Sequence, residues 1–168
     1  MKRQPFFQLT QSAVEQLAAN FDTPLLVLSL EQIERNYRFL KTNLPRVKFY
    51  YAMKANPDMR ILEKMAEMGA SFDVASDGEI KTLAGLGIDG ERMIYANPIK
   101  TTAGLKACNY AGVNKMTFDN IGEVEKMAKA CPGATVLLRF RIDNSSAHVD
   151  LNKKFGAARQ DAVALLKA

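Results

Sequence analysis

The sequence predicts an α/β protein built from repeated strand–helix units, because short apolar runs alternate with helix-like runs along most of the chain. Each strand-like run is followed by a turn signal, then by a helical pattern and a glycine. The runs recur at intervals of about 20 to 24 residues, which is typical of a parallel sheet formed by βα units. The strand candidates are Val47–Met53, Ser71–Ala75, Arg92–Ala96, Lys115–Phe118 and Thr135–Ile142.

The bulk composition fits an ordinary globular domain. Of 168 residues, 48% are apolar and 24% are charged, which excludes a disordered or fibrous chain. The net charge of +5 comes from basic residues spread along the chain, so we expect a solvated surface and no nucleic-acid partner. Apolar stretches such as Thr23–Leu30 are too short to cross a bilayer, and no apolar run follows the basic N-terminus. We therefore expect a cytoplasmic protein without membrane attachment.

The cysteines and the histidine limit the available chemistry. Cys108 and Cys131 form no metal-binding pair, and both fall in predicted helices, where a free cysteine acts as a small apolar residue. We expect neither a disulfide framework nor a metal site. Because His148 is the only histidine, a catalytic histidine with a partner is not expected within these residues.

The segment before the repeats has a different pattern. Met1–Asn20 includes a short helical region, Thr23–Ser29 has the composition of a strand, and Leu30–Leu40 is a predicted helix with one apolar side. Since this strand precedes the repeats, we expect residues 1–30 to belong to a second, β domain and residues 31–168 to form the repeated unit.

Cap residues mark where the first two helices of the repeats begin. Asn56 before Pro57 predicts a cap followed by the first helical position, and Gly69 ends that helix. Ser76 and Glu79 have the spacing of a capping box for the next helix.

The later helices carry similar signals. Thr101 predicts the start of a helix that ends at Gly112, and Asn120 with Glu123 predicts the start of another. A last helical pattern covers Ala157–Ala168.

The two faces of the strands favour a closed barrel over an open sheet. In the first strand one face is bulky and apolar, whereas the other ends in Lys54. In Thr135–Ile142 one face is wholly apolar and the other ends in Arg139 and Arg141. Strands of an open doubly wound sheet are apolar on both faces, so basic groups that point one way indicate a barrel interior. We expect a partial (β/α)8 TIM barrel of about five βα units, since a full barrel takes roughly 250 residues.

Lys54 is the first candidate for chemistry. It ends a strand and precedes a helix, and the active sites of barrels form at the carboxyl ends of strands. Burial among apolar neighbours would make its amine a better nucleophile. By position alone, an exposed loop lysine is the simpler interpretation.

Several motifs together resemble one enzyme family. Tyr51–Asn56 (YAMKAN) is similar to the lysine motif of the fold-type III, alanine racemase-like pyridoxal-phosphate enzymes. Phe72–Glu79 (FDVASDGE) and Ile94–Lys100 (IYANPIK) resemble the ornithine decarboxylase branch of these enzymes. The resemblance covers roughly residues 23–158. Further motifs follow in the order of that branch at Thr117–Asp119, Leu138–Arg139 and Lys154–Gly156.

The resemblance implies pyridoxal 5'-phosphate as the cofactor and roles for particular residues. Lys54 would hold the cofactor through its aldehyde. Asp73 and Arg139, at neighbouring strand ends, would lie beside the cofactor ring and its phenolic oxygen. Glu79 has two interpretations, an active-site carboxylate that supports Lys54 or only a member of the capping box. Arg141 points the same way as Arg139 and would lie at the rim of the site.

The implied reaction is decarboxylation of a basic amino acid, ornithine or else lysine, to a diamine of polyamine biosynthesis. The expected partners are this small-molecule substrate and, in the complete protein, a second copy in a homodimer. The resemblance places further site residues beyond Ala168, namely a histidine stacked on the cofactor ring, a glycine-rich phosphate loop, a glutamate at the pyridine nitrogen and a cysteine–aspartate pair. We therefore expect the chain to be a fragment that is inactive on its own.

Other functions stay open. Diaminopimelate decarboxylase and alanine racemase are the nearest alternative enzymes, although Tyr95–Pro98 favours the polyamine branch. A non-catalytic decarboxylase homologue that binds a regulator of the polyamine pathway would retain most of these motifs. A barrel fragment without cofactor chemistry would leave Lys54 as an ordinary loop lysine.

Overall fold

The computed structural model describes residues 7–142 and 154–168. The chain divides into two compact units, Met1–Val47 and Lys48–Ala168, and each is considered by itself. His148 lies outside the described residues. Within the described ranges, no helix has the length and apolar character needed to cross a membrane.

The described part of the first unit contains two capped helices. α1 (Gln11–Asn20) begins after Thr10, whose hydroxyl accepts a hydrogen bond from a first-turn amide. α2 (Leu30–Asn43) begins after Ser29, whose hydroxyl accepts a hydrogen bond in the same way. Both helices were predicted, and α2 runs one turn further than its sequence pattern indicated.

The predicted strand at Thr23–Ser29 is wrong for this chain. The segment is irregular and pairs with no strand among the described residues. Its apolar side chains are partly or largely exposed, and Leu26 reaches 89%. A strand is stabilised by hydrogen bonds to a neighbouring strand, which composition alone cannot supply.

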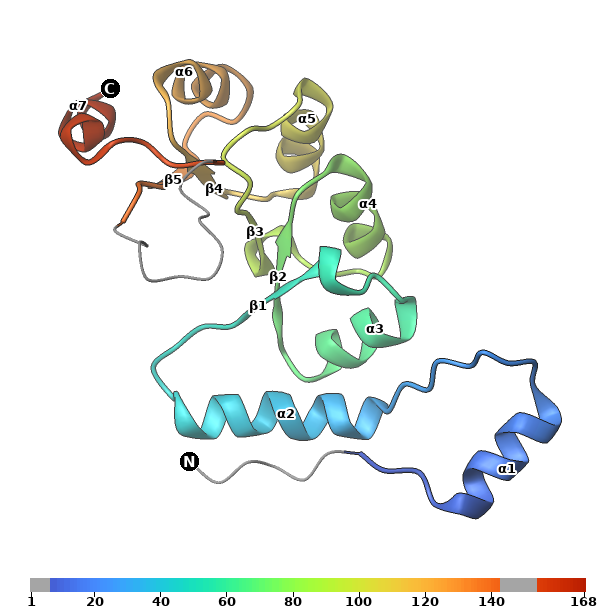
Figure 1. Ribbon diagram of the computed structural model, residues 1–168. Coiled ribbons are helices and arrows are strands. Elements are labelled where there is room, and N and C mark those ends of the chain that lie inside the picture. Colours follow the sequence, from blue (N-terminus) through green and yellow to red (C-terminus); the bar gives the residue numbers. More distant parts are fainter. Residues whose placement is uncertain (1–6, 143–153) are drawn as a thin grey trace. The chain divides into compact units, whose positions relative to one another are not determined.

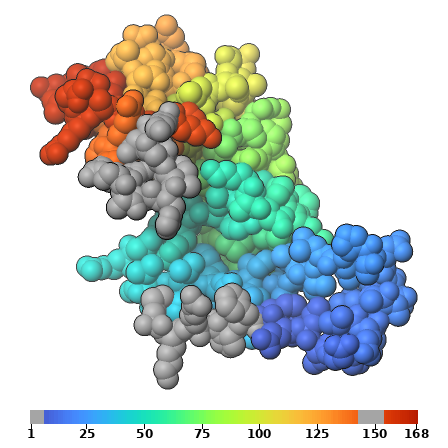
Figure 2. Space-filling model, in the orientation of Figure 1, coloured from blue at the N-terminus to red at the C-terminus, as the bar shows by residue number. Residues whose placement is uncertain are grey.

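The second unit contains a parallel sheet with helices between its strands. Consecutive strands pair in the order β1-β2-β3-β4-β5, and the helices follow in chain order along one side of the sheet (Figure 1). In the space-filling view the colours of this unit, from cyan-green to orange, follow one another in the order of the sequence (Figure 2). Each observed strand lies within its predicted range, which confirms the partial (β/α)8 barrel. The strands are β1 (Tyr50–Ala52), β2 (Ser71–Val74), β3 (Met93–Tyr95), β4 (Lys115–Phe118) and β5 (Thr135–Leu138). The helices that connect them are α3 (Met59–Glu67), α4 (Asp77–Gly85), α5 (Thr102–Ala111) and α6 (Ile121–Ala130).

The core of this unit lies between the sheet and the helices. Side chains alternate between the two faces of a strand, and on the central strands every second residue is buried on the helix side. On the opposite face, Asp73 and Thr117 are half-buried. Side chains therefore alternate between a buried and a less buried face in β2, β3 and β4. The buried strand residues on the helix side are Phe72, Val74, Met93, Tyr95, Met116 and Phe118.

Side-chain caps determine where three of the helices begin. Ser76, Thr101 and Asn120 each accept a hydrogen bond from the amide three residues further on, as predicted. Gly112 ends α5 in the left-handed conformation, with φ at 73°, which favours glycine.

The start of α3 differs from the prediction. The helix begins after Asp58, whose carboxylate accepts a hydrogen bond from the Arg60 amide. Asn56, predicted to be the cap, instead accepts a hydrogen bond from the Asp58 amide. Pro57 therefore lies before the helix, because Asp58 is an equally good cap residue nearer to the apolar stripe.

The last helix is shorter than predicted. α7 (Ala162–Lys167) follows a 3₁₀ turn, η4 (Arg159–Asp161), whereas the sequence pattern predicted a helix from Ala157. Ala157 forms a parallel bridge with Phe140. Its amide donates a hydrogen bond to the Arg139 carbonyl, and its carbonyl accepts one from the Arg141 amide. Backbone groups used in this bridge are not free to enter a helix.

The apolar face of β5 is not covered as predicted. We expected this face to pack on helices, but Val136 is 41% exposed and Phe140 and Ile142 are 50% and 67% exposed. Among the described residues, α6 and α7 leave these side chains open to solvent. Beyond the end of β5, the bridge between Phe140 and Ala157 pairs one point of the outer edge of the sheet.

Close packing at Gly90 provides a test of the fold. Gly90 opens a 3₁₀ turn, η2 (Gly90–Arg92), and an added Cβ would lie 2.2 Å from the Ala111 carbonyl oxygen. We expect Gly90→Ala to lower the free energy of unfolding by about 3 kcal/mol, because backbone atoms would have to move. The matched control is Gly85→Ala in α4, where an added Cβ meets nothing within 4 Å. This control should raise stability by up to about 1 kcal/mol. Urea denaturation compares the two variants, and equal effects would contradict the close approach.

Candidate active site

A cavity of about 350 Å³ lies where the strands of the second unit end. Its walls come from residues at or just after the carboxyl ends of β1, β2, β3 and β5. This is the end at which barrel enzymes form active sites, and the volume is within the range of small-molecule sites. All four predicted site residues line the cavity, and these are Lys54, Asp73, Glu79 and Arg139.

Lys54 reaches the cavity from a 3₁₀ turn, η1 (Met53–Ala55), that directly follows β1. Met53 is 1% exposed and anchors the turn, and the Tyr51 hydroxyl donates a 3.0 Å hydrogen bond to the Asn56 carbonyl on its far side. Lys54 itself is exposed, so the predicted burial among apolar neighbours is wrong for the described residues. The cavity that it lines combines charged side chains with the apolar Ala75, Ala96 and Phe155.

Asp73 carries a partly buried carboxylate on the barrel face of β2. Burial raises its pKa, and the nearby Glu79 carboxylate adds to this rise. Two contacts oppose the shift: the Ala96 amide donates a 3.3 Å hydrogen bond to Oδ1, and the Lys54 ammonium is close enough to attract the charge. Asp73 is therefore a carboxylate whose charge depends on the cations around it.

Glu79 belongs both to the start of α4 and to the cavity. Its amide donates to the Ser76 hydroxyl, as expected for a capping box. Its carboxylate accepts a 2.6 Å hydrogen bond from the Ala75 amide, one residue before the position that a capping box requires. The two interpretations made from the sequence are therefore compatible, since the same side chain holds the strand end and lines the cavity.

Arg139 faces the cavity from the residue after β5. Its guanidinium lies 5.2 Å from the centre of the Phe155 ring, a cation–π arrangement. The expectation that Asp73 and Arg139 lie at neighbouring strand ends is wrong, because β3 and β4 separate β2 from β5. The two side chains approach the cavity from different walls, so a ligand between them would meet opposite charges.

Residues 154–156 add a wall that the sequence analysis did not assign. Phe155 lines the cavity, and the Gly156 amide donates a 2.9 Å hydrogen bond to the Asp119 carboxylate at the end of β4. The Arg141 guanidinium donates a 2.8 Å hydrogen bond to the Gly156 carbonyl, so Arg141 holds this segment. The conspicuous Lys154–Gly156 motif was the available signal, but spacing alone does not reveal which strand end it contacts.

The cysteines lie apart from this chemistry. Both thiols are buried, and burial raises the pKa of Cys108 to about 12, so it is not a ready nucleophile. In the part of the chain that the structure describes, no three histidine, cysteine or acidic side chains are grouped in a way that could hold a metal ion.

Comparison with known proteins places the chain in a family. Residues 30–168 match the family described as "Pyridoxal-dependent decarboxylase, pyridoxal binding domain". The chain therefore belongs to the pyridoxal-dependent decarboxylases, which confirms the resemblance seen in the sequence.

Individual relatives are similar over most of this chain. A lysine/ornithine decarboxylase from Selenomonas ruminantium is 51% identical over 162 residues, which are 96% of this chain and 41% of that protein. The crystal structure of lysine decarboxylase from the same organism matches with a TM-score of 0.89 and 51% identity, covering 96% of this chain and 42% of that one. Antizyme inhibitor 2 from Xenopus laevis is 41% identical over 135 residues, which are 80% of this chain and 29% of that protein. The chain thus spans about two fifths or less of the length of these relatives.

The raised pKa of Asp73 predicts a pH-dependent effect of Asp73→Asn. Stability associated with a raised pKa is present below the pKa of the unfolded chain and is lost as the pH rises through the folded pKa. At about pH 7 the unaltered protein carries a partly buried charge, whereas asparagine keeps an acceptor for the Ala96 amide without that charge. We expect the variant to be the more stable at about pH 7 and similar in stability at about pH 3. Thermal denaturation at both pH values measures the difference. A variant that is less stable at neutral pH alone would show that the Asp73 charge stabilises the fold.

Proposed function

We propose that the complete protein binds pyridoxal phosphate through Lys54 and decarboxylates a basic amino acid. The observation that carries this proposal is the convergence of Lys54, Asp73, Glu79 and Arg139 on one cavity in a chain of the pyridoxal-dependent decarboxylase family. The cavity suits this cofactor because an exposed primary amine, a guanidinium and carboxylates surround a space large enough for a small aromatic ligand. The positive net charge favours the approach of an anionic cofactor.

Each side chain has a task in this proposal. Pyridoxal phosphate supplies the electron sink for loss of the carboxylate when it is bound. The Lys54 amine would hold the cofactor through its aldehyde. The Asp73 carboxylate attracts positive charge at the barrel face, Arg139 attracts an anionic oxygen from the other wall, and Glu79 keeps the end of β2 in place through the Ala75 amide.

The proposed substrate is ornithine or lysine, which becomes a diamine of polyamine biosynthesis. The 51% identity to a lysine/ornithine decarboxylase over nearly the whole chain supports a substrate of this class. Diaminopimelate decarboxylation is the less favoured reaction. We further propose that the working protein is a homodimer, with residues 1–30 in a second domain and residues 31–168 in the cofactor-binding barrel.

A non-catalytic function is the second candidate. The similarity to antizyme inhibitor 2 favours it, because such a relative shares much of the same sequence. The exposed Lys54 amine in a cavity with Asp73 and Arg139 favours the enzyme. Covalent binding of the cofactor separates the two functions.

Lys54 is expected to carry the cofactor. We expect borohydride treatment of the full-length protein with pyridoxal phosphate to label the peptide that contains Lys54, because reduction fixes the carbon–nitrogen bond between a lysine and the aldehyde. Mass spectrometry of the digested protein locates the label. The control is Lys81→Ala, which removes an exposed lysine on α4 that is paired with Asp77 and should leave labelling unchanged. Lys54→Ala should abolish it, and a label on any other lysine would refute the assignment.

Residues 1–168 alone are expected to bind the cofactor weakly and to show no turnover. The proposal that activity needs a longer polypeptide is supported by the chain's coverage of 41% of the lysine/ornithine decarboxylase. It is also supported by the exposed apolar side chains of β5. The test adds pyridoxal phosphate to this polypeptide and follows cofactor absorbance and carbon dioxide release from ornithine and lysine. Stoichiometric binding at Lys54 with measurable turnover would refute it.

A further inference from the structure

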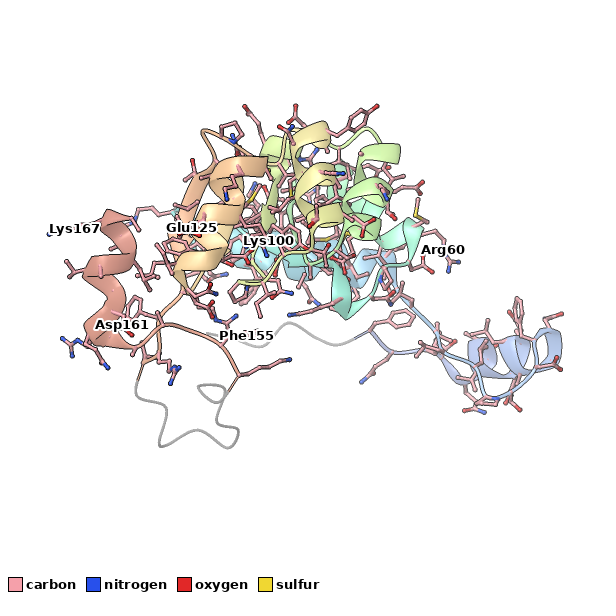
Figure 3. The ribbon with its side chains drawn as sticks, turned by 90° about the horizontal axis from the view of Figure 1, so that it is seen from above. Arg60, Lys100, Glu125, Phe155, Asp161 and Lys167 are labelled. Carbon is pink, nitrogen blue, oxygen red and sulfur yellow. The ribbon has the colours of Figure 1, made fainter. Side chains whose placement is uncertain are left out.

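Lys100 is a fully buried cation close to the cavity but outside its walls. Its side chain has no exposed surface, and Figure 3 shows it among the packed side chains of the second unit, whereas Arg60 lies at the periphery. The Lys100 ammonium lies 2.6 Å from the Thr117 carbonyl and 3.3 Å from each of the Asn97 and Pro98 carbonyls. Most of its partners are therefore main-chain oxygens of the loop after β3 and of β4.

Glu123, in the first turn of α6, supplies the negative charge opposite the Lys100 ammonium. Its side chain is 4% exposed, and one carboxylate oxygen lies 3.0 Å from the Lys100 ammonium and accepts a 3.0 Å hydrogen bond from the Lys100 amide. The other oxygen lies 2.6 Å from the Lys126 ammonium, which also donates to the Lys100 carbonyl. Lys100 is thus held by its side chain, its amide and its carbonyl.

Burying two opposite charges is a costly way to hold a protein together. Desolvation lowers the pKa of Lys100, and the hydrogen bond and charge of Glu123 oppose that shift. A buried ion pair often contributes no more stability than apolar residues of the same size, although removal of one partner is strongly destabilising. Stability of the fold is therefore a weak explanation for the buried Lys100–Glu123 pair. Its contacts to the loop after β3 indicate that it positions that loop.

The loop that Lys100 holds connects directly to the cavity. Ala96 and Asn97 line the cavity, and the Ala96 amide donates the hydrogen bond to Asp73. The Lys100 ammonium also lies 5.8 Å from the centre of the Tyr95 ring, and the Tyr95 hydroxyl donates a 2.8 Å hydrogen bond to the Ala75 carbonyl on the next wall. Movement of Lys100 would therefore be transmitted to both β2 and β3 at their carboxyl ends.

We infer that Lys100 and Glu123 are positioning residues that hold the loop after β3 so that Ala96, Asn97 and Asp73 present a fixed polar wall to the cofactor. The inference rests on the proposed function for the identity of the ligand. Neither side chain touches the cavity, so both act through the loop.

The experiment compares single and double variants of the full-length protein. Lys100→Met leaves Glu123 without its buried partner, so this variant should be both less stable and weaker in cofactor binding. The double variant Lys100→Met/Glu123→Met leaves no buried charge unpaired between these positions, and its stability should recover towards that of the unaltered protein. The contacts to the loop carbonyls and to the Lys100 amide remain lost, so its dissociation constant for pyridoxal phosphate should stay raised by roughly tenfold or more. Glu123→Gln leaves the buried Lys100 cation without its charged partner and should also cost stability. Because it keeps an acceptor for the Lys100 amide, its loss of cofactor affinity should be the smallest of the three.

A second measurement does not need the cofactor. Amide hydrogen exchange of the apo protein should quicken at residues 96, 97, 99 and 100 in the double variant, while exchange in α3 stays unchanged. The matched control is Lys106→Met, which removes an exposed lysine on α5 and should alter neither cofactor binding nor exchange. If Lys100→Met alone does not fold, the double variant supplies both measurements.

Two results would overturn the inference. One is a double variant whose cofactor affinity recovers together with its stability, since Lys100 and Glu123 would then act only on the fold. The other is unchanged amide exchange at residues 96, 97, 99 and 100. Failure of the unaltered protein to bind pyridoxal phosphate at Lys54 would instead refute the proposed function, and the exchange measurement would still decide whether Lys100 orders the loop.

Discussion

All strands of the second unit run in the same direction, so the residues that follow them meet at one edge of the sheet. Side-chain alternation then decides which of them turn towards the helices and which towards the barrel face. Lys54, Asp73 and Arg139 are far apart in sequence, yet this constraint brings them to one cavity. The local features of the site, from the turn at η1 to the cap of α4, adjust side chains that the strand direction has already brought together.

This constraint explains why the sequence predicted the site better than its surroundings. Strand ends and alternation are local patterns, and they sufficed for Arg139 to be assigned to the barrel face. Asp73 was assigned through the resemblance of its motif, and its position on β2 agrees with that assignment. The strand predicted at Thr23–Ser29 failed because strand pairing depends on a neighbour that local composition does not specify. The predicted start of α3 was wrong for another reason. Asn56 and Asp58 are both good cap residues, and the backbone conformation decides which of them caps the helix.

Two glutamates show how far a local rule extends. Glu79 and Glu123 both occupy the third position of a helix whose cap accepts their amide, as the sequence predicted. Their carboxylates, however, bind elsewhere: Glu79 binds the Ala75 amide, and Glu123 binds two lysines. The partner of Glu123 is 23 residues away in sequence, and no periodicity connects it to Lys100. A motif therefore predicted the backbone of each helix start but not the use of the acidic group.

Lys100 holds the loop after β3 through main-chain carbonyls. One side chain of that loop therefore remains largely exposed to solvent. Ile99 is 55% exposed although it lies between the buried Lys100 and the cavity-lining residue Asn97. A cysteine introduced at position 99 could carry a fluorescent dye, because both native thiols are buried and their raised pKa values make them slow to react. Such a dye would report on the arrival of a ligand in the cavity from two residues away, without replacing any group that lines it.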